Sequence, residues 1–235
     1  MRRQHTRHIC TVIRSTHIPI SRAKLYATPM PKRANPNHPT RERLIDTVLE
    51  LTGSRPIEKI TSDQVLERSG VSKGSLYHHF EDFQDLIGAA AVKLYASGVN
   101  DSIEQLEHLF ERCDSVESFY AALDSVTQAT QDPNRHPARM QRITLISLAS
   151  RTEKLRAVLA AEQQRLSDTL SALIRRAQLN GWVDRKLDAQ AVAVFIQAYT
   201  TGRVLDDISL SPVDPASWTA LIKHMIRLLL PPRKA

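Results

Sequence analysis

Aromatic residues, glycine and cysteine are scarce in this chain of 235 residues. Only 5% of the residues are aromatic, and the sequence holds seven glycines and two cysteines. Cys10 and Cys113 lie far apart, so they predict neither a disulfide framework nor a metal cluster, and we expect no metal and no cofactor. No apolar run approaches the roughly 20 residues that cross a bilayer. These absences exclude a disulfide-rich secreted domain and a membrane-spanning protein, and they favour the cytoplasm.

The residues that are abundant favour helices. Hydrophobic residues make up 42% of the chain and charged residues 24%, which is ordinary for a globular protein. Leu, Ala, Arg, Glu and Gln are frequent, and these side chains lose little rotamer freedom in a helix. The composition therefore predicts an all-α fold.

The net charge of +7 is unevenly distributed. The first forty residues carry eight basic side chains and no acidic one, whereas the rest of the chain holds 24 basic and 25 acidic side chains. The basic character thus belongs to an amino-terminal tail, and a high isoelectric point alone is poor evidence for a DNA-binding fold.

We predict that residues 1–39 form a disordered basic tail, because prolines interrupt them and no apolar period is sustained. Three interpretations compete for this segment. Translation starts at Met30; or the tail is a genuine arm whose basic side chains contact phosphates; or it is a targeting peptide, which its Arg-rich, acid-free composition resembles.

From Thr40 onward, apolar residues recur with helical spacing. Thr40 is placed to cap a first helix, which Gly53 ends. Thr61 and Gln64 have capping-box spacing, which predicts a second helix to about Ser69. This begins a compact domain that we place at residues 40–88.

The second helix is followed by a turn and a third, short helix. Gly70 makes the turn, since only glycine takes a positive φ without strain. Ser72 caps a helix over residues 73–80, and Asp82 opens a fourth helix. Two short helices joined by a turn that contains glycine predict a helix-turn-helix unit, whose second helix enters the major groove of DNA.

The residue types on the third helix suit DNA recognition. Lys73 and Ser75 can bond to base edges or phosphates, and Gly74 weakens the helix but permits close backbone approach. Tyr77 and His78 can bond to phosphate oxygens. The start of the second helix at Thr61 offers backbone amides to an anion.

The other residues of this segment have plainer interpretations. Val71, Leu76 and Phe80 are predicted to be core residues, and His79 to be packed or at the surface.

Residues 64–80, QVLERSGVSKGSLYHHF, closely resemble the amino-terminal signature of the TetR (tetracycline-repressor-like) family. The resemblance covers about residues 44–87. It implies contacts to operator DNA from Thr61, Ser72, Lys73, Ser75, Tyr77 and His78. It also implies a larger carboxy-terminal helical domain that holds a small-molecule pocket and a dimer interface.

Two positions depart from the family pattern. The family usually has alanine near Leu66, and it often has a lysine just after the position of Phe80. Here the residues after Phe80 are acidic, and residues 41–90 hold six basic and nine acidic side chains. A phosphate contact is thereby lost, for which the basic tail can compensate.

Apolar periodicity predicts that the rest of the chain, residues 89–231, is a helical effector-binding and dimerisation domain. The expected helices cover residues 82 to beyond 103, 115–132, 138–150, 155–180, 188–207 and 218–229. The last two are apolar on more than one side and therefore need more than one partner.

We expect a homodimer whose interface includes small and apolar positions of the last two helices, namely Ala191, Phe195, Ala198, Gly202, Trp218, Leu221 and Met225. The alternative is that these residues are buried within one chain. Helix position alone suggests, for a mostly apolar effector pocket, Phe119, Leu123, Met140, Ile143, Thr144 and Phe195. Each of these is also an ordinary core candidate.

The sequence therefore predicts a homodimeric regulator, most simply a repressor that a small-molecule effector releases from operator DNA. An alternative is a DNA-binding regulator or architectural protein without a ligand response. A helical enzyme is a remote alternative, because no phosphate loop, zinc motif or nucleophile elbow is present. The effector, the operator, and activation as opposed to repression are not encoded in any motif.

Overall fold

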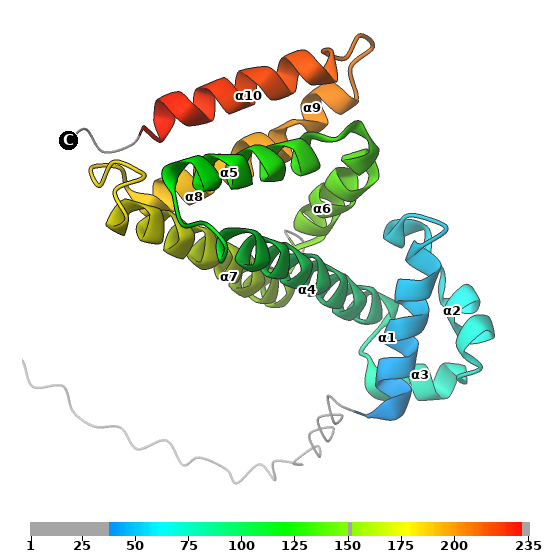
Figure 1. The fold of residues 1–235 in the computed structure, drawn as a ribbon. Helices are drawn as coiled ribbons and strands as arrows, with labels where there is room; N and C mark the ends of the chain where they lie inside the picture. The colour runs from blue at the N-terminus through cyan, green and yellow to red at the C-terminus, as the bar shows by residue number, and fades with distance from the viewer. Residues whose placement is uncertain (1–37, 150–151, 232–235) are drawn as a thin grey trace, which may run out of the picture. The chain divides into compact units, whose positions relative to one another are not determined.

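The computed structural model describes residues 38–149 and 152–231, which are helical and contain no β-strand (Figure 1). The helices are α1 (Pro39–Thr52), α2 (Ser62–Ser69), α3 (Lys73–His79), α4 (Phe83–Phe110), α5 (Val116–Gln131), α6 (His136–Ala149), α7 (Glu153–Leu179), α8 (Ala189–Gly202), α9 (Val204–Asp207) and α10 (Pro215–Leu229), with 3-10 turns at Ile57–Lys59 and Pro133–Arg135. The all-α prediction is confirmed. The predicted tail, with Met30, lies outside the described residues except for its last two positions.

The first helix begins at Pro39, two residues before the start that a cap at Thr40 predicts, and Thr40 is not its cap. His38 Nδ1 accepts a hydrogen bond from the backbone amide of Thr40 at 3.2 Å, and Pro39 occupies the first helical position. Proline suits that position because its φ is preset and it has no amide to satisfy. The helix ends at Gly53 as expected, although Gly53 keeps a right-handed φ of −65°.

The helix-turn-helix forms as its caps predict. Thr61 and Gln64 make a reciprocal capping box at the start of α2. Gly70 follows α2 with a φ of +67°, and Ser72 Oγ accepts the amide of Ser75 at 3.2 Å to start α3. These hydrogen bonds join residues within three positions of one another and define where each helix begins.

A small apolar core holds α3 against α1, α2 and α4. Leu44 and Val48 of α1, Val65 of α2, Leu76 of α3 and Leu86 of α4 are almost completely buried. Truncation of such a residue to alanine costs about 2–5 kcal/mol. The core therefore sets which face of α3 remains outside.

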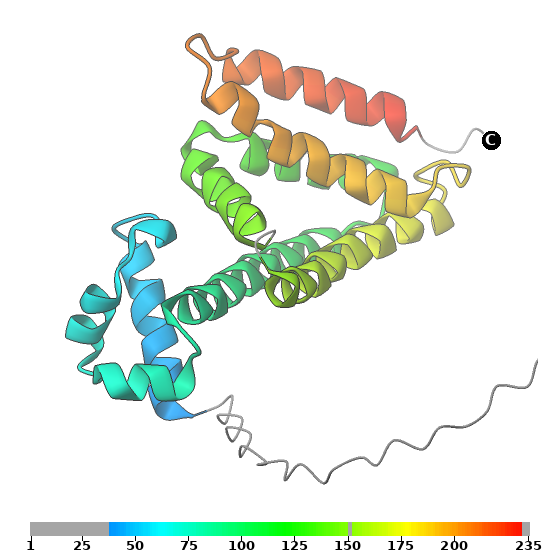
Figure 2. The same cartoon turned by 180° about the vertical axis from the view of Figure 1, so that it is seen from behind.

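The helix α4 belongs to both parts of the chain. It packs against α1 near its beginning and against α5, α6 and α7 along the rest of its length (Figures 1 and 2). The predicted domain boundary at residues 88 and 89 thus falls inside one continuous helix.

The remaining helices form a second layered core. The most extensive packing of α7 is against α4 and α8. Helix α10 packs on α5, and helix α6 packs on α4, α7 and α9. Leu166, Leu170 and Ile174 place the apolar stripe of α7 in this core. No described helix combines the length and apolar composition needed to cross a membrane.

The predicted continuous helix over residues 188–207 is wrong, because the chain breaks between α8 and α9 at Arg203. This side chain is 3% exposed and faces two acidic groups, with Nη2 3.3 Å from Asp206 Oδ2 and Nε 3.8 Å from Asp207 Oδ1. Its guanidinium also lies over the Trp218 ring, 5.4 Å from the centroid. These ionic and aromatic contacts outweigh the apolar period on which the prediction rested.

Candidate nucleic-acid interface

The exposed face of α3 carries the side chains expected to meet DNA. Lys73 and His78 are exposed, Tyr77 is 48% exposed, and Ser75 is half-buried. Leu76 points the other way, into the core. This short helix of seven residues therefore separates a packing face from a face with hydrogen-bonding side chains.

No close packing requires a glycine at position 74 within the described part of the chain. A Cβ added there would meet no protein atom within 4 Å, and the residue is exposed in the first turn of α3. Glycine costs a helix roughly 0.8–1 kcal/mol relative to alanine. An exposed glycine at this position therefore fits close approach by something outside the chain.

The start of α2 is partly occupied by its own cap. The Thr61 amide donates to Gln64 Oε1 at 3.2 Å, so that amide is not available for the anion contact expected from the sequence. The amides of Ser62 and Asp63 in the same turn have no partner within the described residues. A phosphate at this end would meet these two amides and the Thr61 hydroxyl.

Three imidazoles lie at the junction of α1 and α3. The ring centroids of His38 and His79 are 4.5 Å apart, and those of His78 and His79 are 5.1 Å apart. Burial lowers the pKa of His79, and the neighbouring His38, His78 and Arg41 lower it further. The pKa of His79 thus lies below the ordinary value of a histidine.

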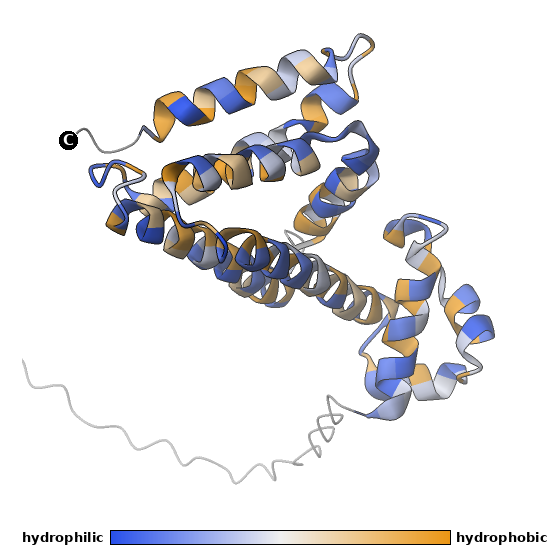
Figure 3. Cartoon of the chain, in the orientation of Figure 1, coloured by the Kyte–Doolittle hydropathy of each residue, from blue (hydrophilic) through white to orange (hydrophobic). Residues whose placement is uncertain are grey.

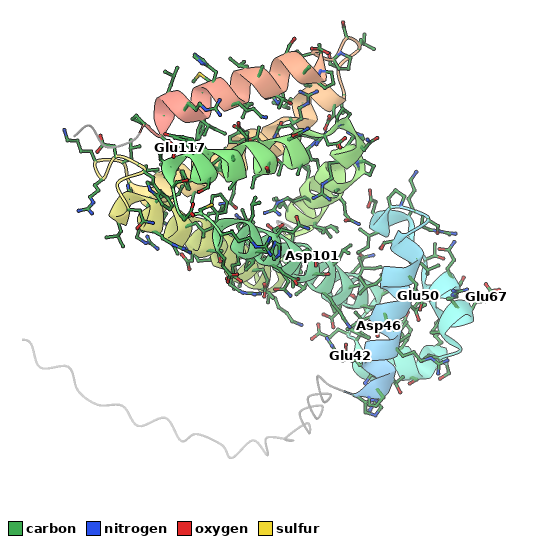
Figure 4. All side chains as sticks on the ribbon, viewed as in Figure 1. Glu42, Asp46, Glu50, Glu67, Asp101 and Glu117 are labelled. Atoms are coloured by element: carbon green, nitrogen blue, oxygen red, sulfur yellow. The ribbon has the colours of Figure 1, made fainter. Side chains whose placement is uncertain are left out.

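Acidic side chains of this domain lie on α1 and α2 (Figure 4), and three more, Glu81, Asp82 and Asp85, follow α3 around the start of α4. Glu42, Asp46 and Glu50 follow one another along α1, whereas α3 carries no acidic residue. Lys93 Nζ of α4 bonds to Glu42 Oε2 at 3.0 Å and to Asp46 Oδ1 at 2.7 Å. The local excess of acid therefore does not fall on the recognition helix.

The predicted dimer residues lie mainly on the surface of the chain. Phe195 and Met225 are 41% and 38% exposed. Four more of the predicted residues are also exposed, namely Ala191, Ala198, Gly202 and Leu221. Figure 3 shows hydrophobic positions alternating with hydrophilic ones along α10. Trp218 differs, because its Nε1 donates to Gln131 Oε1 at 2.7 Å inside the chain.

The predicted pocket residues are not gathered around one described cavity. Phe119 and Leu123 are buried on α5, and Phe119 packs against the rings of Phe110 and Trp182. The α6 residues Met140, Ile143 and Thr144 are half-buried, and Phe195 of α8 is exposed. Phe119 borders only a void of about 10 Å³.

A polar chain through the carboxy-terminal core was not predicted. Gln163 Oε1 of α7 accepts from Tyr95 Oη of α4 at 2.5 Å and from Arg142 Nη2 of α6 at 2.7 Å. Gln163 Nε2 donates to Gln197 Oε1 of α8 at 2.5 Å, and Gln197 in turn donates to Ser167 Oγ at 3.1 Å. Burial raises the pKa of Tyr95, while Arg142 lowers it. The signal in the sequence is two glutamines within apolar stripes.

Comparison with known proteins agrees with this geometry. Residues 44–90 match the family model of the bacterial regulatory proteins of the tetR family. The nucleoid occlusion factor SlmA of Marinomonas is 22% identical over 203 residues, which cover 82% of this chain and 98% of that protein.

Solved structures share the fold across most of the chain. The reduced form of Escherichia coli NemR aligns with a TM-score of 0.59 at 17% identity, over 82% of this chain and 98% of that one. A TetR-family regulator from Rhodococcus aligns with a TM-score of 0.56 at 23% identity, over 81% and 98% of the two chains. One from Mesorhizobium loti aligns with a TM-score of 0.60 at 15% identity, over 81% and 94%.

The fold and the exposed face of α3 are those of a helix-turn-helix DNA-binding domain. Residues 44–90 form a DNA-binding domain of the tetR type, and about four fifths of the chain share their helical fold with solved regulators described as TetR-family proteins.

Proposed function

We propose that the chain is a homodimeric transcriptional repressor, acting in the cytoplasm, that a small-molecule effector releases from operator DNA. The observation that carries the proposal is the two-sided character of α3. Its Leu76 side is anchored in the core while Lys73, Tyr77 and His78 face outward without an acidic neighbour on the same helix.

In the proposed complex, α3 lies in the major groove. Lys73 and Ser75 reach base edges or phosphates, and Tyr77 and His78 bond to the backbone. Gly74 lets the helix approach closely, while Ser72 and Thr61 contact phosphates from the starts of α3 and α2.

Dimerisation is proposed through the apolar surfaces of α8 and α10. Isolated exposed apolar residues are ordinary, but both α8 and α10 expose several of them, among them Val194, Phe195, Leu221 and Met225, and an extended apolar surface marks an interaction site. A two-fold axis there would place two copies of α3 about one DNA turn apart, roughly 34–36 Å.

We place effector recognition in the carboxy-terminal core, where α6 brings Met140, Ile143 and Thr144 beside the polar chain through Arg142 and Gln163. An effector that takes over a hydrogen bond from one of these polar side chains would shift α6 or α8 relative to α4. It acts only through its different affinities for the DNA-bound and released arrangements.

A DNA-binding protein without a ligand response is the second candidate. The similarity to a relative described as a nucleoid occlusion factor favours it. A screen for compounds that release bound DNA separates the two, because only the first candidate has such a compound.

The test is binding of the full chain to DNA from upstream of its own gene, measured by fluorescence anisotropy at fixed salt. Lys73→Ala and Tyr77→Ala are compared with wild type, and scrambled DNA is the reference. Loss of a good base contact costs roughly 1–3 kcal/mol. We therefore expect about five- to 150-fold weaker binding to the specific fragment.

Lys186→Ala is the charge-matched control, because Lys186 is exposed in the loop between α7 and α8. Its affinity for the specific fragment should stay within about twofold of wild type if surface charge alone is not responsible. Equal and steeply salt-dependent binding by all four proteins to both DNAs would contradict the assignment of α3.

A further inference from the structure

A cavity of about 650 Å³ lies where α1 meets α4, α6 and α7. Its apolar walls come from four helices and include Ile45, Ile87, Val92, Leu148, Leu155 and Val158. The volume falls within the roughly 300–1,000 Å³ of small-molecule sites. None of the residues predicted for the effector pocket lines it, and neither does the polar chain through Gln163.

Charged side chains border this cavity, and those that line it are four acids and three bases. Every base is engaged: Lys93 with Glu42, Lys154 Nζ with Asp85 Oδ1 at 3.3 Å, and Arg41 with Glu42. The cavity therefore has no base left over to attract an anion.

Two of the bordering acids have no cationic partner among the described residues. Glu81 makes no side-chain ion pair, and Asp82 Oδ1 only accepts the backbone amide of Asp85 at 2.7 Å as the cap of α4. Both are exposed and adjacent at the edge of the apolar walls.

We propose that this cavity binds a hydrophobic organic cation. The apolar walls would remove the hydrophobic body from water, and Glu81 and Asp82 would face its positive charge. The site is separate from the effector region proposed above. Because one wall is α1 of the DNA-binding domain and another is α7, an occupant contacts both parts of the chain.

The probe for the test is tetraphenylphosphonium, with tetraphenylborate as a match of the same shape and opposite charge. Binding of each to the full chain is measured by isothermal titration calorimetry without DNA. We expect saturable binding of the cation with one site per chain and at least tenfold weaker binding of the anion. No binding of the cation, or tighter binding of the anion, would overturn the proposal.

The charge and the cavity are then tested separately. Glu81→Gln with Asp82→Asn should weaken cation binding about two- to thirtyfold, as expected for two surface charges, while Asn still caps α4. Asp101→Asn with Glu104→Gln is the control, because both residues are exposed further along α4 and outside the cavity lining (Figure 4 labels Asp101). Equal weakening by the two pairs would contradict a local role for Glu81 and Asp82.

Val92→Phe places a larger side chain within the walls. It should reduce binding of the cation at least tenfold while circular dichroism shows an unchanged helix content. Unchanged affinity in this folded variant would place the bound cation elsewhere and overturn the assignment. Since none of these measurements uses DNA, their failure is distinguishable from failure of the proposed repressor function.

Discussion

Arg139 and Asp207 form a bidentate ion pair across 68 residues of sequence. Arg139 Nε lies 2.6 Å from Asp207 Oδ2 and Arg139 Nη2 lies 2.7 Å from Asp207 Oδ1, with both side chains less than 8% exposed. Arg139 Nη1 also donates to the carbonyl oxygens of Thr130 and Asp132. The pair thereby joins α6, the end of α5 and α9.

Arg139→Ala should destabilise the fold by about 3–5 kcal/mol, because it leaves the Asp207 carboxylate buried with fewer partners. The free energy of unfolding in urea measures the loss. Arg165→Ala is the control, since Arg165 pairs with Glu162 on the exposed side of α7 and such a pair contributes at most about 1 kcal/mol. Equal losses in the two variants would show that the buried pair contributes no more than a surface pair.

Acidification should destabilise the chain through His79. Burial and the nearby positive groups lower its pKa below 6.5, so the unfolded chain takes up this proton at a higher pH than the folded chain. The resulting stability is present above the unfolded pKa and declines as pH falls below about 6.5.

Thermal unfolding between pH 8 and pH 5 measures this effect. In His79→Gln, the melting temperature should fall less steeply with decreasing pH than it does in the wild-type protein. His108→Gln, at an exposed position of α4, should keep the wild-type slope. A slope in His79→Gln that equals the wild-type slope would exclude His79 as the source.

Gly74→Ala should separate stability from DNA binding. Alanine stabilises the helix by up to about 1 kcal/mol, and its Cβ meets no protein atom within 4 Å. We therefore expect a higher melting temperature together with weaker binding to the specific DNA fragment, because the added methyl group holds the backbone of α3 away from the groove.

Gly70→Ala is the matched substitution in the neighbouring turn. With φ at +67°, an L side chain is strained at this position, so the substitution should lower the free energy of unfolding by about 1–2 kcal/mol. If Gly74→Ala left DNA affinity unchanged while raising the melting temperature, close approach of α3 at this position would be refuted.

Met225→Glu should produce a monomer if α10 lies in the dimer interface. A carboxylate in an apolar interface loses its hydration without gaining a partner. Sedimentation velocity of the variant and of wild type gives the two masses. Leu179→Glu is the control, because Leu179 is exposed at the end of α7 and outside the proposed interface. A variant that remains dimeric would place the interface away from Met225.

Local features of the DNA-binding domain could be predicted from sequence because their causes are local. The capping box of Thr61, the turn at Gly70 and the caps at Ser72 and Asp82 each depend on residues within four positions. Thr40 was the exception, since the amide that it contributes is satisfied by His38, a residue type that the usual capping preferences do not favour.

The features that were not predicted depend on distant partners. Arg203, where α8 gives way to α9, lies against the ring of Trp218, and Trp218 in turn donates to Gln131, which is 87 residues away. The polar chain from Tyr95 to Gln197 likewise joins four helices. Helical periodicity assigns such residues to a face but does not say which neighbour that face meets.

Because α4 is one continuous helix, a movement of its end in the carboxy-terminal core is transmitted to the DNA-binding domain. Its 28 residues span roughly 42 Å at 1.5 Å per residue, so a tilt of about 5° at one end displaces the other by roughly 4 Å. In the proposed dimeric repressor each copy of α3 fits its own major groove, so a displacement of that size would be enough to spoil the match. Release of DNA in that proposal requires no unfolding of the helix-turn-helix, and a small rigid rotation is the change to look for between the bound and free proteins.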